Sequence, residues 1–146
     1  MTENELAKEI VDAAYKIHTQ IGPGLLESAY EAILAYELRK RGFQIECQKE
    51  VPVMYETVQI EIGYRADIIV EDKVIVELKS VEMTAPVHKK QLLTYLKLAD
   101  KRLGLLINFG EALIKNGITR VVIQLEDSPE DKENIAHAKT PIHQEH

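Results

Sequence analysis

Residues 63–79 read GYRADIIVEDKVIVELK, and the other segments of the chain are built around this stretch. Two runs of β-branched residues, 68–70 and 74–76, have the composition of β-strands. The polar residues 71–73 separate the two runs. The stretch is therefore predicted to form two strands joined by a tight turn, with charged side chains placed on both strands.

The length of that turn determines which side chains face one another. If Val70 pairs with Val74 across a three-residue loop, Asp67 lies opposite Glu77, whereas a two-residue loop sends the two carboxylates to opposite faces of the sheet. Residues 71–73 contain neither Asn-Gly nor Gly-Gly, the pairs that favour a two-residue turn. We therefore predict the three-residue loop, with both carboxylates on one face.

Asp67, Glu77 and Lys79 form a pattern that suits phosphodiester hydrolysis. Glu77 and Lys79 share a face because side chains alternate along a strand. Two opposed carboxylates repel unless a hard divalent cation such as Mg²⁺ lies between them. A neighbouring lysine can orient water or stabilise charge on a phosphate. The alternative interpretation is the solvent-facing side of a half-exposed strand, where charged residues are common.

The composition is typical of one globular domain without a membrane segment. Of the 146 residues, 45% are hydrophobic and 29% charged, and no apolar run approaches the ~20 residues that span a bilayer. Cys47 is the only cysteine, which fits a reducing cytoplasm. The net charge of −6 argues against nucleic-acid binding, but −4 of it falls on residues 126–146, which leaves −2 on residues 1–125.

Sequence periodicity predicts further helices and strands. Thr2 and Glu5 form a candidate capping box for a first helix, which residues 22–24 end. Thr84 is the expected N-cap of a third helix, with Pro86 in its first turn. The expected helices are 2–20, 25–40 and 84–99. Apolar residues also alternate with polar ones from 43 to 62, where a hairpin turn is expected at 56–57, and later strands are expected at 103–109 and 119–125.

These elements predict an α/β (α+β) fold in which helices flank a mixed central β-sheet, in the order α-α-β-β-β-β-α-β-β. Residues 1–125 are expected to form the single domain. Residues 126–146 are polar and lack periodicity, so we expect a disordered tail.

Two helical stripes carry further candidate site residues. His88, Gln91 and Tyr95 share one face of the third helix, because they are three and four residues apart. They could contact a ligand phosphate, or they could form the polar edge of an ordinary amphipathic helix. Glu27 and Tyr30 share a face at the start of the second helix, where a glutamate is also favoured by the helix dipole alone.

The spacing Gly24…Glu27…Tyr30 resembles the motif that names the GxxExxY family, whose members are similar to the PD-(D/E)xK nuclease superfamily. The Gln-x-x-x-Tyr element of the third helix resembles the RecB-like branch. Ala66 departs from the superfamily pattern, which has proline there. The likeness continues in order through residues 63–67, 76–79, 91–96 and 104–110.

The resemblance implies a restriction-endonuclease-like core and a cytoplasmic, metal-dependent nuclease. In the superfamily the aspartate and the glutamate bind Mg²⁺ or Mn²⁺ and the lysine assists attack by water. By match, Asp67 and Glu77 are metal ligands that take part in catalysis, and Lys79 is the catalytic lysine. The remaining expected site residues are Glu27 as a further metal ligand, Gln91 as a catalytic residue, and Tyr95, Tyr30 and His88 as supporting residues.

The function implied by this resemblance is hydrolysis of nucleic-acid phosphodiester bonds, with DNA as the expected partner. One alternative is a non-catalytic module on the same fold that binds nucleic acid or protein, which the acidic balance of the chain favours. A second alternative is a structural homodimer whose aliphatic surfaces pair.

Overall fold

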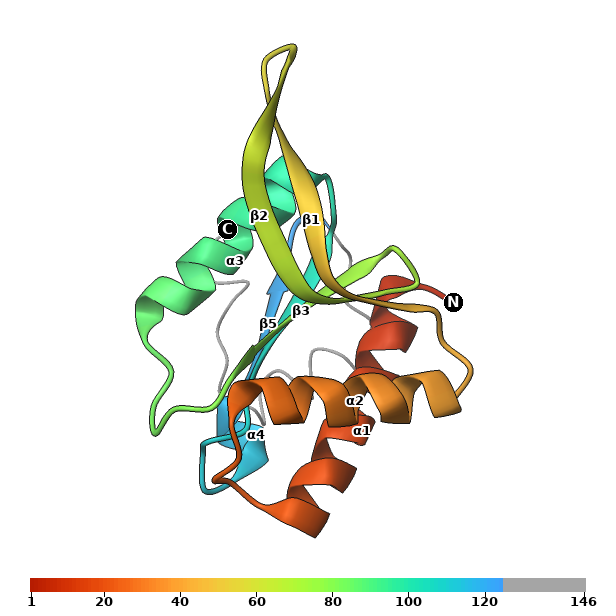
Figure 1. The fold of residues 1–146 in the computed structure, drawn as a ribbon, viewed down its shortest axis with the longest axis vertical. Helices are drawn as coiled ribbons and strands as arrows, with labels where there is room; N and C mark the ends of the chain where they lie inside the picture. The colour runs from red at the N-terminus through yellow and green to blue at the C-terminus, as the bar shows by residue number, and fades with distance from the viewer. Residues whose placement is uncertain (125–146) are drawn as a thin grey trace.

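The computed structural model describes residues 1–124, which form a five-stranded sheet with helices on both faces (Figure 1). The expected tail, residues 126–146, lies outside the described residues. The strands are β1 (Ile45–Tyr55), β2 (Val58–Val70), β3 (Val74–Lys79), β4 (Leu103–Asn108) and β5 (Ile118–Val122), and they lie in that order across the sheet. The helices are α1 (Glu3–Ile21), α2 (Glu27–Lys40), α3 (Pro86–Ala99) and α4 (Ile114–Gly117).

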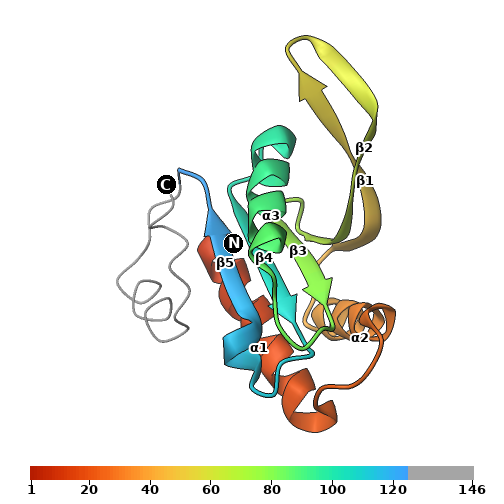
Figure 2. The same ribbon diagram turned by 90° about the vertical axis from the view of Figure 1, so that its left-hand side faces the viewer.

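The mixed sheet expected from the sequence is confirmed. Strands β3 and β4 are parallel and are joined by α3, whereas all the other neighbours are antiparallel. Helix α3 covers one face of the sheet and α1 lies behind the other (Figure 2). On β3, Val76 packs toward α1 and α2 and Ile75 packs toward α3. Because side chains alternate, Glu77 and Lys79 lie on the α3 side.

The order of elements differs from the expected one in two places. Three strands precede α3 instead of four, and α4 separates β4 from β5. Strand β2 continues through Gly63, where an added Cβ would come within 2.4 Å of the carbonyl oxygen of Val51. The missing side chain lets β1 approach closely at the register shift between Val51 and Val53. The hairpin therefore bends there without interrupting the strand.

The ends of the first two helices follow local sequence signals. Thr2 and Glu5 form the predicted capping box of α1, with N–H···O distances of 2.8 and 3.1 Å. Helix α2 ends at Lys40, and Gly42 adopts φ +96° just beyond it. None of the described helices is long and apolar enough to cross a membrane.

The cap predicted for α3 is wrong. The N-cap residue is Ala85 instead of Thr84, and the N–H of Ala85 donates a hydrogen bond to Nδ1 of His88 at 3.3 Å. The hydroxyl of Thr84 accepts a hydrogen bond from the buried side chain of Asn108 at 3.2 Å. That tertiary contact draws Thr84 away from the helix terminus.

Candidate active site

Asp67 and Glu77 lie where β2 and β3 part. Backbone pairing between these strands starts at Val70 and Val74 and extends over three residue pairs, which confirms the predicted three-residue loop. This register brings Asp67 beside Glu77, with each residue at the first position beyond the paired segment. The two carboxylates predicted to face one another are therefore neighbours at the strand junction.

The two side chains replace backbone pairing at this junction. The N–H of Asp67 donates to Oε1 of Glu77 at 3.3 Å, and the N–H of Leu78 donates to Oδ2 of Asp67 at 2.8 Å. Each carboxylate thus accepts a backbone hydrogen bond from the neighbouring strand. These hydrogen bonds fix both carboxylates although the strands themselves diverge.

The environment of Glu77 disfavours its charged form. Burial raises the pKa of Glu77 to about 8, and the negative charge of Asp67 acts in the same direction. Hydrogen bonds from the Tyr64 hydroxyl and the Asp67 amide, together with the charge of Lys79, oppose the rise in pKa only in part. Additional positive charge beside Glu77 would therefore favour its ionised form.

Tyr64 links this carboxyl to helix α3. Its hydroxyl donates a hydrogen bond to Oε1 of Glu77, and its ring stacks on that of Tyr95 with 3.6 Å between centroids and 13° between planes. Burial, followed by the charge of Glu77, raises the pKa of the Tyr64 phenol, so it remains a donor. Tyr95 therefore reaches the site through Tyr64, a residue that the sequence reasoning did not select.

The other residues of the α3 stripe differ in their surroundings. His88 has its pKa lowered by burial and then by the positive charge of Lys79, and the charge of Glu27 opposes these effects. Its ring thus lies within electrostatic reach of both residues while it caps the helix. The side chain of Gln91 is exposed and makes no hydrogen bond to the residues that the structure describes, so its catalytic role stays a prediction.

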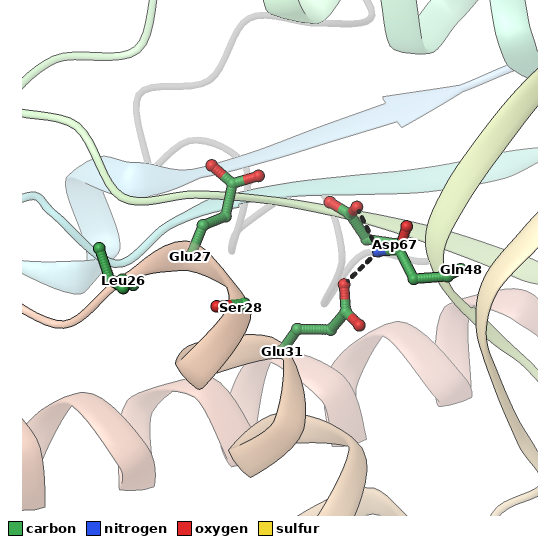
Figure 3. A pocket seen from close by; sticks show the side chains of 6 residues that line it. All are labelled: Leu26, Glu27, Ser28, Glu31, Gln48 and Asp67. Carbon is green, nitrogen blue, oxygen red and sulfur yellow. Dashed lines mark hydrogen bonds between the residues drawn. The ribbon is translucent and has the colours of Figure 1, made fainter.

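A pocket of about 380 Å³ opens beside Asp67. Figure 3 shows Glu27, Glu31 and Asp67 turned toward the same space, with Gln48 between the last two. The two glutamates are four residues apart on α2, so they project from the same side of its first turns. The pocket is completed by Leu26 and Ser28. Its lining is therefore markedly acidic.

Gln48 and Glu31 were not among the predicted site residues. Nε2 of Gln48 donates to Oε1 of Glu31 at 2.5 Å and to Oδ1 of Asp67 at 3.1 Å. Burial raises the pKa of Glu31, the charge of Asp67 adds to the rise, and the hydrogen bond from Gln48 opposes it. The four-residue spacing from Glu27 could have pointed to Glu31. Gln48 gives no such signal, because its position depends on a left-handed backbone conformation, φ +52°.

Tyr30 lies in the hydrophobic core and does not line the pocket. Its side chain is fully buried and its ring stacks on that of Phe109, with 4.4 Å between centroids. The hydroxyl donates to the carbonyl oxygen of Gly22 and accepts from the N–H of Leu25. Tyr30 thus fixes the turn before α2, the helix that carries Glu27.

The donor chemistry at the strand junction fits a hard divalent cation. Mg²⁺ usually takes one or two carboxylates from a protein and completes its shell with water and phosphate oxygens; Asp67 and Glu77 supply such a pair. Within residues 1–124, no group of three or more His, Cys, Asp or Glu is placed to hold a metal ion. The structure therefore does not gather Glu27 with that pair into one cluster.

The mixed sheet with flanking helices is of the restriction-endonuclease-like type. The family model described as the PD-(D/E)XK nuclease superfamily matches residues 4–121. The chain belongs to this superfamily, whose members typically use divalent metals. Searches of the curated proteins and of the solved structures found no significant match.

Proposed function

We propose that this chain is a cytoplasmic, Mg²⁺- or Mn²⁺-dependent nuclease that hydrolyses phosphodiester bonds in DNA, with residues 1–125 as its single catalytic domain. Within the superfamily we assign it to the GxxExxY family and the RecB-like branch. The observation that carries the proposal is the pair of half-buried carboxylates, Asp67 and Glu77, each held by a backbone N–H of the neighbouring strand, with Lys79 two residues further along the same face.

Asp67 and Glu77 would hold the cation. Bound there, a divalent cation would lower the pKa of the attacking water and balance the charge of the phosphate. Lys79 would orient that water and donate to a phosphate oxygen as charge develops on it. Glu27, at the edge of the acidic pocket, would contribute through its charge, and Gln91 would donate to the substrate.

A second candidate is a non-catalytic module on the same fold that binds a protein or a nucleic acid. The observation that favours it is the acidity of the pocket, in which Glu27 and Glu31 stand beside Asp67. Three carboxylates repel a phosphate backbone unless cations intervene. The net charge of −6 points in the same direction. A homodimer is a further form that this module could take.

Cleavage assays separate the two candidates. Wild type would be incubated with end-labelled single- and double-stranded DNA and RNA in Mg²⁺, Mn²⁺ or EDTA, beside Glu77→Gln, Lys79→Ala and Glu56→Gln purified identically. Glu56 is exposed in the β1–β2 turn and serves as the matched control.

A nuclease should cleave DNA with metal but not with EDTA, and both site variants should lose at least about a hundredfold in rate. The Glu56→Gln variant should cleave like wild type. If wild type leaves every substrate intact with either metal, the nuclease assignment is wrong and the binding module replaces it. Equal cleavage by all four proteins would instead identify a contaminating nuclease.

A further inference from the structure

The hydroxyl of Tyr64 is the contact through which helix α3 reaches the proposed metal ligand. Tyr64 lies on β2 and is a buried residue, with 9% of its surface exposed. The hydroxyl donates to Oε1 of Glu77 on β3, and the ring stacks on Tyr95 of α3. Tyr64 of β2 thus links two other elements of the fold, β3 through its hydroxyl and α3 through its ring.

The two oxygens of Glu77 have unequal surroundings. Oε1 accepts hydrogen bonds from the Tyr64 hydroxyl and from the Asp67 amide. Oε2 has no hydrogen-bond partner in the described part of the chain, residues 1–124. A carboxylate with one oxygen engaged by donors presents its other oxygen for ligation. The hydrogen bonds on Oε1 therefore determine the direction in which Oε2 points.

The ring of Tyr64 is held in place from two sides. Tyr95 stacks against it with 13° between the ring planes. Val51, its partner across the β1–β2 ladder, packs in the same buried cluster. Aromatic stacking of this kind stabilises the pair beyond what the buried area alone provides. The hydroxyl thus has a fixed position, as an orienting hydrogen bond requires.

We propose that Tyr64 is a positioning residue of the metal site, which holds Oε1 of Glu77 and leaves Oε2 for the cation. The proposal rests on the proposed function, because it assigns Tyr64 a role toward the same cation. Partners that hydrogen-bond a ligating side chain typically change metal affinity by about 10–100-fold when they are removed. Tyr95 acts one step further away by fixing the ring of Tyr64.

Calorimetric titration with Mn²⁺, without nucleic acid, tests the proposal on the full chain. Tyr64→Phe keeps the stacked ring and deletes the hydroxyl, so Mn²⁺ affinity should fall about tenfold. Tyr95→Leu keeps that hydroxyl and removes the stack, and a smaller loss, about threefold, is expected. Tyr55→Phe deletes an exposed hydroxyl on the same hairpin and should bind like wild type.

The outcomes distinguish this proposal from the nuclease proposal. If wild type binds Mn²⁺ and Tyr64→Phe binds it equally well, Tyr64 does not position Glu77, and the metal site itself stands. If wild type binds no Mn²⁺ at millimolar concentration, the proposed function fails and the role of Tyr64 fails with it. Melting curves in EDTA show whether each variant folds; should Tyr64→Phe not fold, unaltered affinity in Tyr95→Leu would overturn the proposal.

Discussion

Glu37 is a buried carboxylate and Glu77 a half-buried one, and the two have opposite surroundings. Both oxygens of Glu37 accept from Nζ of Lys16 at 3.1 Å, and one also accepts from Nε of Arg41 at 3.0 Å. The hydrogen bond from Arg41, followed by that from Lys16, lowers the pKa of Glu37. Burial and the neighbouring charge of Asp67 instead raise the pKa of Glu77 to about 8.

The difference separates a carboxylate whose charge is paired from the carboxylate that we propose as a metal ligand. The negative charge of Glu37 on α2 is balanced by Lys16 of α1 and by Arg41, the C-cap residue of α2, so the pair with Lys16 joins the two helices. Glu77 meets another carboxylate, and Lys79 compensates for its burial only in part. Strongly perturbed ionisable groups of this second kind gather at functional sites. A divalent cation would supply the charge that the surroundings of Glu77 do not.

The pH dependence of stability should show the largest difference between the two carboxylates. The carboxyl of Glu77 has a pKa of about 8 when folded and 4.5 as its ordinary value. Between these values the folded state holds a proton that the unfolded state has released. The free energy of unfolding of the metal-free protein should therefore fall as the pH rises, by up to about 1.4 kcal/mol per pH unit.

Urea unfolding in EDTA at pH 5, 6, 7 and 8 measures this slope. Glu77→Gln has no carboxyl to titrate, so this part of the slope should disappear. The lowered pKa of Glu37 acts in the opposite sense: its stabilisation is complete above the unfolded pKa and is lost as the pH falls through the folded one. Parallel pH profiles for wild type and Glu77→Gln would show that Glu77 titrates normally.

Lys79, near Glu77, and Lys16, which pairs with Glu37, should differ in their effect on cleavage. Lys79→Ala should slow DNA cleavage by about a hundredfold or more, because it removes charge stabilisation at the phosphate. Its affinity for Mn²⁺ should stay close to that of wild type, since lysine is not a ligand. Lys16→Ala is the matched control from the Glu37 cluster and should cleave at the wild-type rate when assayed below its melting temperature. An equal loss in both variants would contradict a catalytic role for Lys79.

Glu37→Gln should reduce stability without affecting the metal site. We expect a loss of about 2 kcal/mol in the free energy of unfolding, less than the roughly 3–5 kcal/mol for a fully buried pair. The loss should be moderated because Arg41 retains its ion pair with Asp12 and Lys16 is partly exposed. Urea unfolding at pH 7 in EDTA measures it. A variant as stable as wild type would mean that the ion pairs contribute nothing.

The smallest effect on stability is expected for Glu31, which lines the pocket beside Asp67. Glu31→Gln keeps an oxygen that can accept from Gln48 and removes one charge near Asp67. Because the side chain borders an open pocket, the free energy of unfolding should change by no more than about 0.5 kcal/mol. The same urea measurement tests this. A large change would indicate that Glu31 contributes to stability as Glu37 does.

The junction of the two central strands could be predicted because local sequence determines it. The composition of residues 71–73 favours a three-residue loop, and that loop alone brings Asp67 beside Glu77. The capping box at Thr2 and Glu5 is equally local. In each case the interacting groups are within about ten residues of one another, so spacing alone specifies the contact.

The remaining parts of the site depend on contacts between distant segments. Tyr64 matters because α3 brings Tyr95 onto its ring, and spacing does not show which aromatic residues will stack. Gln48 reaches Asp67 from a left-handed conformation that its residue type does not favour. Thr84 is not the helix cap because its hydroxyl bonds to a distant residue, Asn108.

The thermal unfolding of three proteins with and without Mn²⁺ tests most directly whether Glu77 belongs to a metal site. At a hundred times the dissociation constant, bound metal adds about 2.7 kcal/mol, or roughly 5–10 °C in Tm for a chain of this size. Wild type and Glu37→Gln should both show this rise over EDTA, although the second starts from a lower Tm. Glu77→Gln should show none. An unchanged wild-type Tm in millimolar Mn²⁺, or an equal rise in Glu77→Gln, would contradict the metal site.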